Sequence, residues 1–121
     1  MTYCVGMLLD RGLVFMSDTR TNSGVDNIST YRKMFTWKRP GERVVTLLTV
    51  GNLATTQAVV SLLDERTKTP AERAPSILEA PTMFQAARIV GELLREAIRT
   101  TLDEGQTAES QFSASFILGG Q

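Results

Sequence analysis

The chain has 121 residues, 42% hydrophobic and 21% charged, which is the composition of one globular domain with a modest core. Thirteen basic and thirteen acidic side chains cancel, so the net charge favours neither nucleic acid nor an anionic membrane as a partner. The sequence contains no histidine and only one cysteine, which excludes a Ser-His-Asp or Cys-His mechanism within the chain and disfavours a zinc site.

The composition also sets expectations for location and cofactors. The longest apolar runs are far shorter than the ~20 residues of a membrane span, and no secretory signal opens the chain. One cysteine cannot form an internal disulfide, so a reducing compartment is the default. No glycine-rich phosphate loop is present. We therefore expect a soluble cytoplasmic protein that uses no cofactor and no metal.

The first residues predict a β-hairpin, with strands over residues 3–9 and 13–18. Because the two strands advance in opposite directions by roughly 3.3 Å per residue, the hairpin returns Asp18 to the neighbourhood of Thr2. Removal of Met1 would give Thr2 a free amine beside its hydroxyl, the minimum equipment of a nucleophile activated by its own N-terminus. Considered alone, Thr2 is also an ordinary first residue of an edge strand, since threonine favours strands.

The next stretch predicts a loop followed by two strands. Residues 21–24, Thr-Asn-Ser-Gly, have the composition of a loop, and a short strand is expected over residues 33–37. Lys33 could then approach Thr2 and Asp18 from this third strand. Residues 43–50 are apolar and β-branched with little polar alternation, which is typical of a strand buried on both faces.

Two helices and a last strand are predicted after Gly51. Asn52 is the expected N-cap of a helix over residues 53–68, and Thr82 with Gln85 has capping-box spacing at the start of a helix over residues 83–102. The last strand is expected over residues 112–118. The predicted buried stripes are Leu53, Thr56, Val60 and Leu63 in the first helix, and Phe84, Ala87, Gly91, Leu94, Ile98 and Leu102 in the second.

This order of elements indicates an α+β sandwich rather than a doubly wound fold, because strands and helices do not alternate regularly. We expect a single domain over residues 1–121, with its strands in one antiparallel sheet and both helices packed on one face. An apolar strand at the end of the chain has no following strand as a partner. A truncated chain is therefore the expectation.

Several motifs combine position and spacing in a specific way. They are Met-Thr-Tyr-Cys-Val-Gly at the start, Ser-Asp-Thr-Arg at residues 17–20, Lys33, and Gly-Asn-Leu-Ala-Thr-Thr-Gln from Gly51. Together they resemble the proteasome β-type subunit superfamily of N-terminal nucleophile hydrolases, and within it the bacterial proteasome-like ancestral beta-subunit (Anbu) proteins. The resemblance runs through the whole chain but covers only the first part of the family's domain. It implies the first half of a four-layer α-β-β-α sandwich.

The resemblance also implies a proteasome-type threonine peptidase whose catalytic residues are Thr2, Asp18, Lys33 and Gly51. The Thr2 hydroxyl would attack a peptide carbonyl while the freed amine accepts the proton. Lys33 would lower the effective pKa of that hydroxyl, and Asp18 would keep Lys33 charged and in place. The Gly51 N–H would supply the oxyanion hole, and the absent side chain would let substrate approach closely.

The remaining site residues have supporting roles in this interpretation. Arg20 and Thr49 are assigned to substrate binding: Arg20 pairs with a carboxylate or a carbonyl behind the site, and Thr49 points into the specificity pocket. Cys4 is interpreted as buried core rather than as a nucleophile, because nothing in the sequence lowers its pKa. Expected partners are a peptide or unfolded-protein substrate and further copies of the chain, with an ATP-dependent unfoldase left open.

Two other functions stay open on the sequence. While Met1 is attached, the Thr2 nitrogen is an amide and cannot act as a base, so the chain could be a non-catalytic assembly subunit of the same fold. The same nucleophile could also serve an amidohydrolase that acts on a small amide. The mass of the N-terminus separates the first alternative from the peptidase, and the class of substrate separates the second.

Overall fold

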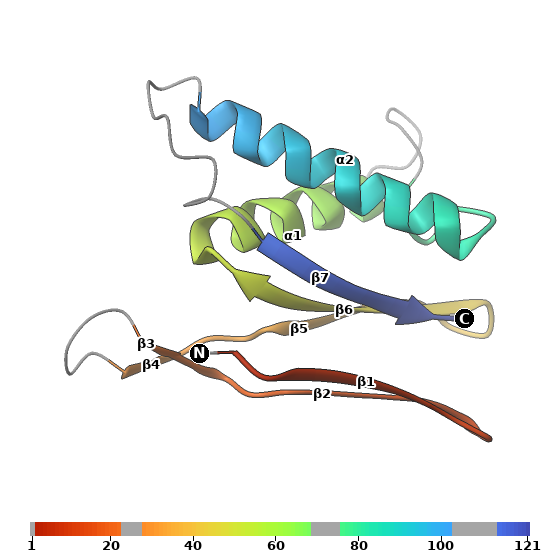
Figure 1. Cartoon of the computed structure of the whole chain (residues 1–121). Helices are drawn as coiled ribbons and strands as arrows, with labels where there is room; N and C mark the ends of the chain where they lie inside the picture. The colour runs from red at the N-terminus through yellow and green to blue at the C-terminus, as the bar shows by residue number, and fades with distance from the viewer. Residues whose placement is uncertain (1, 23–27, 69–75, 103–113) are drawn as a thin grey trace.

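The computed structural model describes residues 2–22, 28–68, 76–102 and 114–121. In chain order the elements are β1 (Cys4–Leu9), β2 (Gly12–Ser17), β3 (Arg20–Asn22), β4 (Ile28–Thr30), β5 (Met34–Arg39), β6 (Arg43–Gly51), α1 (Leu53–Lys68), α2 (Met83–Leu102) and β7 (Ala114–Gly120). Helices α1 and α2 cover one face of the β5-β6-β7 sheet, and the β1-β2 hairpin lies against the other face (Figure 1). The α+β class predicted from the sequence is confirmed.

Strand β6 is the centre of this arrangement. It pairs antiparallel with β5 on one side and with β7 on the other. Every side chain from Val45 to Thr49 is buried, because the helices cover one face of β6 and the hairpin covers the other. The prediction of a strand buried on both faces is confirmed, and β6 leads directly into the site residue Gly51.

Side-chain caps fix where the helices begin. The Thr55 N–H donates to Asn52 Oδ1 at 3.0 Å, and the Gln85 N–H donates to Thr82 Oγ1 at 3.2 Å. Each bond satisfies a backbone donor that the first turn of a helix leaves without an intrahelical partner. These caps account for where the helices begin, and both helices span the predicted residues, Leu53–Lys68 and Met83–Leu102.

The predicted stripe of α1 is largely confirmed, whereas that of α2 is only partly right, because Leu94 packs half-buried against the core but Phe84 and Ala87 are exposed. Thr56, Val60 and Leu63 are buried in α1, as predicted. In α2 the predicted stripe is displaced: Phe84 is 72% exposed, and Leu102 lies outside the residues whose side chains are described. The residues that α2 buries are Ala86, Val90, Leu93 and Ala97. The predicted and the buried stripe both follow the helical period, so periodicity alone could not decide which face of α2 is buried. The buried stripe has a small alanine at each end, which lets α2 pack closely against α1 and the sheet.

The prediction of one antiparallel sheet is also wrong. The described strands form three separate ladders, β1-β2, β3-β4 and β5-β6-β7. The residues predicted as a loop include Thr21 and Asn22, which belong to β3; Ser23 and Gly24 lie outside the described residues. The short strand predicted over 33–37 is β5, which begins one residue after Lys33, and the last strand is β7.

The hairpin lies on the sheet because its inner face carries a large ring opposite glycine. A side chain at Gly119 of β7 would overlap the Phe15 ring of β2, and a Cβ at Gly6 would lie 3.3 Å from the same ring. The aromatic side chain therefore fills the space between hairpin and sheet. No helix among the described residues is long and apolar enough to cross a membrane.

Candidate active site

Buried Lys33 and half-exposed Asp18 form an ion pair next to the start of the chain. Lys33 directly precedes β5 and is only 6% exposed. Its Nζ donates to both carboxylate oxygens of Asp18, each at 3.0 Å, and to the main-chain carbonyl of Arg20 at 2.6 Å. A buried ammonium needs such partners, because an unpaired charge in the interior is strongly unfavourable. The predicted contact between Asp18 and Lys33 is present.

The hairpin register brings Asp18 back to the residue after Thr2. Cys4 lies opposite Ser17, so Asp18 follows at the open end of the hairpin. The Asp18 N–H donates to the Tyr3 carbonyl at 3.0 Å, and the Tyr3 N–H donates to Asp18 Oδ1 at 2.8 Å. This Tyr3 amide is the peptide bond that joins Thr2 to the strand. The Asp18 carboxylate therefore hydrogen-bonds both the backbone amide next to Thr2, the predicted nucleophile, and the Lys33 ammonium.

The electrostatics of Asp18 follow from these contacts. The Tyr3 backbone hydrogen bond, then the bond from Lys33, lower the pKa of the Asp18 carboxyl to about 2. A weaker bond from the Arg20 N–H, at 3.3 Å to Oδ2, acts in the same direction. Asp18 is therefore ionised at neutral pH and keeps a negative charge beside the Lys33 ammonium.

Thr2 itself is half-buried at the entrance to β1, and Met1 lies outside the described residues. The hydrogen bonds described for Lys33 Nζ go to Asp18 and to Arg20. The approach of Nζ to the Thr2 hydroxyl stays a prediction. The structure brings Thr2 within one peptide bond of the Asp18 carboxylate, which is the neighbourhood that the hairpin argument required.

Thr49 and Gly51 lie at the end of β6 nearest this ion pair. Thr49 is 5% exposed, and both its N–H and its hydroxyl donate to the Lys33 carbonyl, at 2.9 and 3.2 Å. Gly51 is exposed and has a φ of 118°, a conformation that favours glycine. Its exposure leaves room for a substrate to approach the backbone there. Its role as an oxyanion donor stays a prediction, as does the contact of Thr49 with substrate.

Arg20 and Cys4 flank the same cluster. Arg20 contributes through its main chain, whose carbonyl accepts from Lys33 and whose N–H donates to Asp18, while the residue itself is exposed. Cys4 is half-buried rather than fully buried as expected, and its thiol lies 3.7 Å from the Thr49 carbonyl. Burial raises the pKa of this thiol, although the Lys33 charge opposes the effect. The thiol is therefore protonated at neutral pH, which disfavours Cys4 as a nucleophile.

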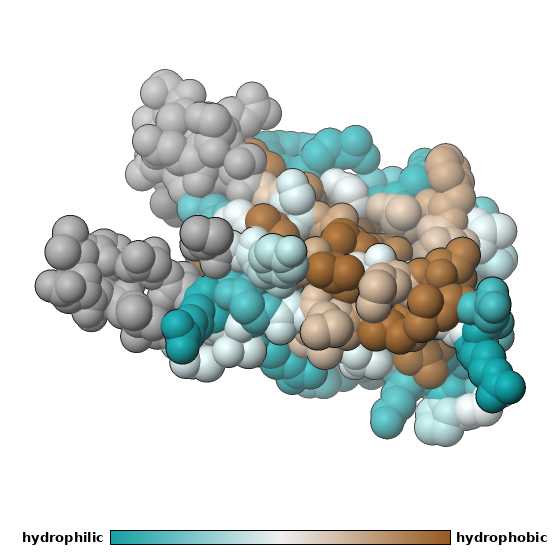
Figure 2. Space-filling model, turned by 60° about the horizontal axis from the view of Figure 1, so that its bottom comes forward, coloured by the Kyte–Doolittle hydropathy of each residue, from teal (hydrophilic) through white to brown (hydrophobic). Residues whose placement is uncertain are grey.

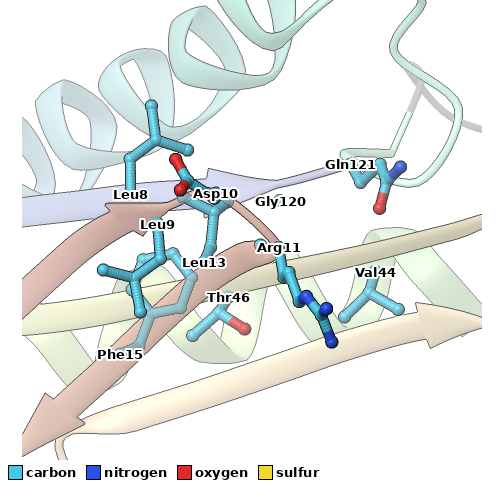
Figure 3. Close-up of a pocket in the computed structure, with 11 residues that line it drawn as sticks. Leu8, Leu9, Asp10, Arg11, Leu13, Phe15, Val44, Thr46, Gly120 and Gln121 are labelled. Atoms are coloured by element: carbon cyan, nitrogen blue, oxygen red, sulfur yellow. The ribbon is translucent and has the colours of Figure 1, made fainter.

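A pocket that the sequence did not predict lies at the opposite end of the hairpin. It has a volume of about 570 Å³ and lies between the β1-β2 turn and the end of the β6-β7 ladder (Figure 3). Its lining includes Leu8, Leu9, Leu13, Phe15 and Val44, with Asp10 and Arg11 contributed by the turn. None of the predicted site residues lines it.

Among known proteins, the chain matches solved structures of Anbu proteins. No protein-family profile and no curated protein matches the chain. An Anbu mutant from a Hyphomicrobium species is 48% identical with a TM-score of 0.82, over 100% of this chain and 46% of that one. The "Helical Assembly of the Anbu Complex" from Pseudomonas aeruginosa is 42% identical with a TM-score of 0.84, over 100% of this chain and 48% of that one.

A third solved structure is similar to the same extent. It is Anbu, described as an ancestral beta-subunit, from Yersinia bercovieri, at 41% identity and a TM-score of 0.85, over 100% of this chain and 48% of that one. The chain therefore spans just under half the length of the proteins that it matches. At these identities the similarity concerns sequence as well as fold.

Proposed function

Because this chain belongs to the Anbu (ancestral beta-subunit) family, we propose that it is the N-terminal part of a proteasome-type threonine peptidase subunit. The observation that carries the proposal is the ion pair between buried Lys33 and Asp18, whose carboxylate also accepts from the N–H of Tyr3, the residue after Thr2. An ammonium held close to the start of the chain is what an N-terminal threonine nucleophile needs, and the Asp18–Tyr3 bond supports such a placement of Lys33.

The proposed reaction uses Thr2 after removal of Met1. The Thr2 hydroxyl attacks the peptide carbonyl, and its proton passes to the free Thr2 amine. Lys33 stabilises the forming alkoxide, and the Gly51 N–H stabilises the oxyanion of the tetrahedral intermediate. The C–N bond then breaks as the leaving amine takes the proton. Water hydrolyses the resulting ester and regenerates the hydroxyl.

The proposal also concerns the fold, which would extend beyond the layers that the described residues form. Residues 1–121 would be the N-terminal portion of a four-layer α-β-β-α sandwich. The hairpin supports this: Phe15 faces the sheet, so strand alternation points the neighbouring positions away from it. Apart from Gly12, the outward positions of the hairpin carry apolar side chains, namely Val5, Met7, Leu9, Val14 and Met16.

The outer face of the hairpin is therefore an apolar surface (Figure 2). Met16 is 60% exposed and Leu9 is 52% exposed on it. Proteins rarely leave a contiguous apolar face of this kind open to water, because covering it removes apolar area from solvent. Further layers of the same subunit would cover this face in the complete protein.

Self-association and a peptide substrate are parts of the same proposal. The related Pseudomonas protein is described as a helical assembly, and an oligomer would enclose a nucleophile of broad reactivity. The single cysteine, which cannot form an internal disulfide, is consistent with a cytoplasmic location, and the neutral net charge with protein rather than nucleic-acid partners. Static light scattering of the intact protein is expected to give an oligomer. A strict monomer over a wide concentration range would contradict the assembly part of the proposal.

Activity is tested by hydrolysis of fluorogenic peptides, with small amides as the comparison. The intact protein, with an N-terminal mass that shows loss of Met1, should cleave peptides, and Thr2→Ala should abolish cleavage. Retention of Met1 with no hydrolysis would favour the non-catalytic assembly subunit. Hydrolysis of small amides alone would favour the amidohydrolase.

A further inference from the structure

The geometry points to a positioning role for Thr49: we infer that its hydroxyl holds the Lys33 backbone in place for catalysis. This inference rests on the proposed threonine peptidase function. It differs from the expectation that Thr49 projects into a substrate pocket. In the structure Thr49 is 5% exposed, and its hydroxyl donates to the Lys33 carbonyl at 3.2 Å. A hydroxyl engaged inside the protein is not presented to a substrate.

The location of Lys33 explains why a second bond to its carbonyl matters. The β5-β6 ladder has Met34 opposite Leu48 as its first pair, so Lys33 lies just outside the strand. The Thr49 N–H, at 2.9 Å from the Lys33 carbonyl, continues the ladder by one bond. Ladder ends fray more readily than ladder centres. The Thr49 hydroxyl adds a second donor to the same carbonyl and holds the lysine backbone where the strand pairing ends.

Lys33 is in this way fixed at both of its ends. Its backbone is bound by Thr49, and its ammonium is bound by the Asp18 carboxylate and the Arg20 carbonyl. The orientation of the long lysine side chain depends on both anchors, because either end could otherwise swing about the rotatable bonds between them. The Thr49 hydroxyl therefore contributes to where the positive charge lies.

Thr49 also connects Lys33 to the strand that carries the nucleophile. The Thr49 carbonyl accepts from the Cys4 thiol, whose sulfur lies 3.7 Å away, and Cys4 follows Thr2 by two residues. Thr49 and Gly51 are two residues apart on β6, so their Cβ and equivalent Hα positions lie on the same face of the strand. The end of β6 thus contacts both Lys33 and the start of β1, and it also carries the exposed Gly51.

The test compares Thr49→Val, which removes the hydroxyl but keeps the branched shape, with Thr49→Ser, which keeps the hydroxyl. The intact, methionine-free protein is assayed with a panel of peptides that differ in the residue before the cleaved bond. For Thr49→Val we expect kcat to fall on the order of tenfold for every peptide, with KM unchanged. Thr49→Ser should recover most of the lost kcat.

Other results would show that Thr49 contacts substrate or that its hydroxyl has no role in catalysis. A change in the ranking of the peptides, or a rise in KM at constant kcat, would place Thr49 in the substrate pocket and overturn the inference. Unchanged kcat in Thr49→Val, or a loss in Thr49→Ser as large as in Thr49→Val, would overturn it as well. Light scattering and thermal unfolding check that each variant assembles. Thr49→Ala is the second hydroxyl-free variant if Thr49→Val does not fold.

Failure of the proposed function gives a different result from failure of this inference. If the wild-type protein has lost Met1 and cleaves neither peptides nor small amides, the proposed function fails and the inference fails with it. If the wild-type protein cleaves peptides and Thr49→Val cleaves them equally well, only the inference fails.

Discussion

Replacement of Lys33 by alanine should remove most of the peptidase activity while leaving the fold in place. A unit charge about 4 Å from a forming alkoxide is worth about 4 kcal/mol at the effective dielectric of a partly desolvated site. That energy corresponds to a rate loss on the order of a thousandfold. Lys33 is 6% exposed, so solvent screens its charge little. The Asp18 carboxylate at 3.0 Å opposes the charge, which makes a thousandfold the upper end of the expected loss.

Asp18 keeps other partners in the variant, which is why we expect the fold to survive. Its oxygens still accept from the Tyr3 N–H at 2.8 Å and from the Arg20 N–H at 3.3 Å. The matched control is Lys38→Ala, which makes the same change of charge at an exposed position of β5. The assay is kcat/KM for a fluorogenic peptide, with light scattering to confirm assembly. If Lys33→Ala does not fold, Lys33→Met keeps the apolar stem and replaces it.

The reasoning would be refuted by activity of Lys33→Ala within a factor of three of the Lys38→Ala control. That result would show that the positive charge does not act on the reacting oxygen. Arg20→Lys provides a further comparison, because Arg20 contributes to the site through its main chain. It should lose much less activity than Lys33→Ala.

The remaining predictions concern pH and the backbone. Because the pKa of Asp18 is lowered from 3.8 to about 2, the stability that Asp18 contributes is complete above pH 3.8 and disappears as the pH falls through about 2. Urea unfolding across this range should show that loss, and Asp18→Asn should remove it; an identical pH dependence in the variant would contradict the assignment. Gly51→Ala should lower the free energy of unfolding by about 1–2 kcal/mol, since φ is 118° there. Gly91→Ala, in the middle of α2 with no atom near the added Cβ, should raise it by about 1 kcal/mol; equal effects of the two substitutions would refute the argument from φ.

The helices could be predicted from sequence because their signals are local. Asn52 and Thr82 each hydrogen-bond a backbone N–H three residues later, and these capping residues fixed the first residue of α1 and of α2. The face that α2 buries was not predicted, because Phe84 and Ala86 begin neighbouring stripes with the same period. Contact with α1 and the sheet selects between such stripes, and this contact is not a local property of the helix.

The division of the strands into ladders was not predictable for a related reason. Strands over the first hairpin and over β6 have similar apolar composition, and both are consistent with pairing in one sheet. The structure separates them because the Phe15 ring packs against Gly119 across two layers. Pairing between strands far apart in sequence depends on such packing rather than on the composition of either strand.

The site shows the same contrast between local and distant information. The return of Asp18 to the start of the chain follows from hairpin geometry, and its contact with Lys33 was expected. The bond from the Thr49 hydroxyl to the Lys33 carbonyl was missed, because a main-chain acceptor leaves no signal in residue type. The residue identities at Lys33 and Thr49 are compatible with many other arrangements.

The central claim is that Thr2, freed of Met1, is the nucleophile. The most direct measurement is to incubate the intact protein with an electrophilic peptide and to locate the adduct by mass spectrometry of its proteolytic fragments. The account predicts an N-terminal fragment that begins with Thr2 and carries one adduct on that residue. An adduct on Cys4, or an unmodified fragment that still begins with Met1, would contradict it.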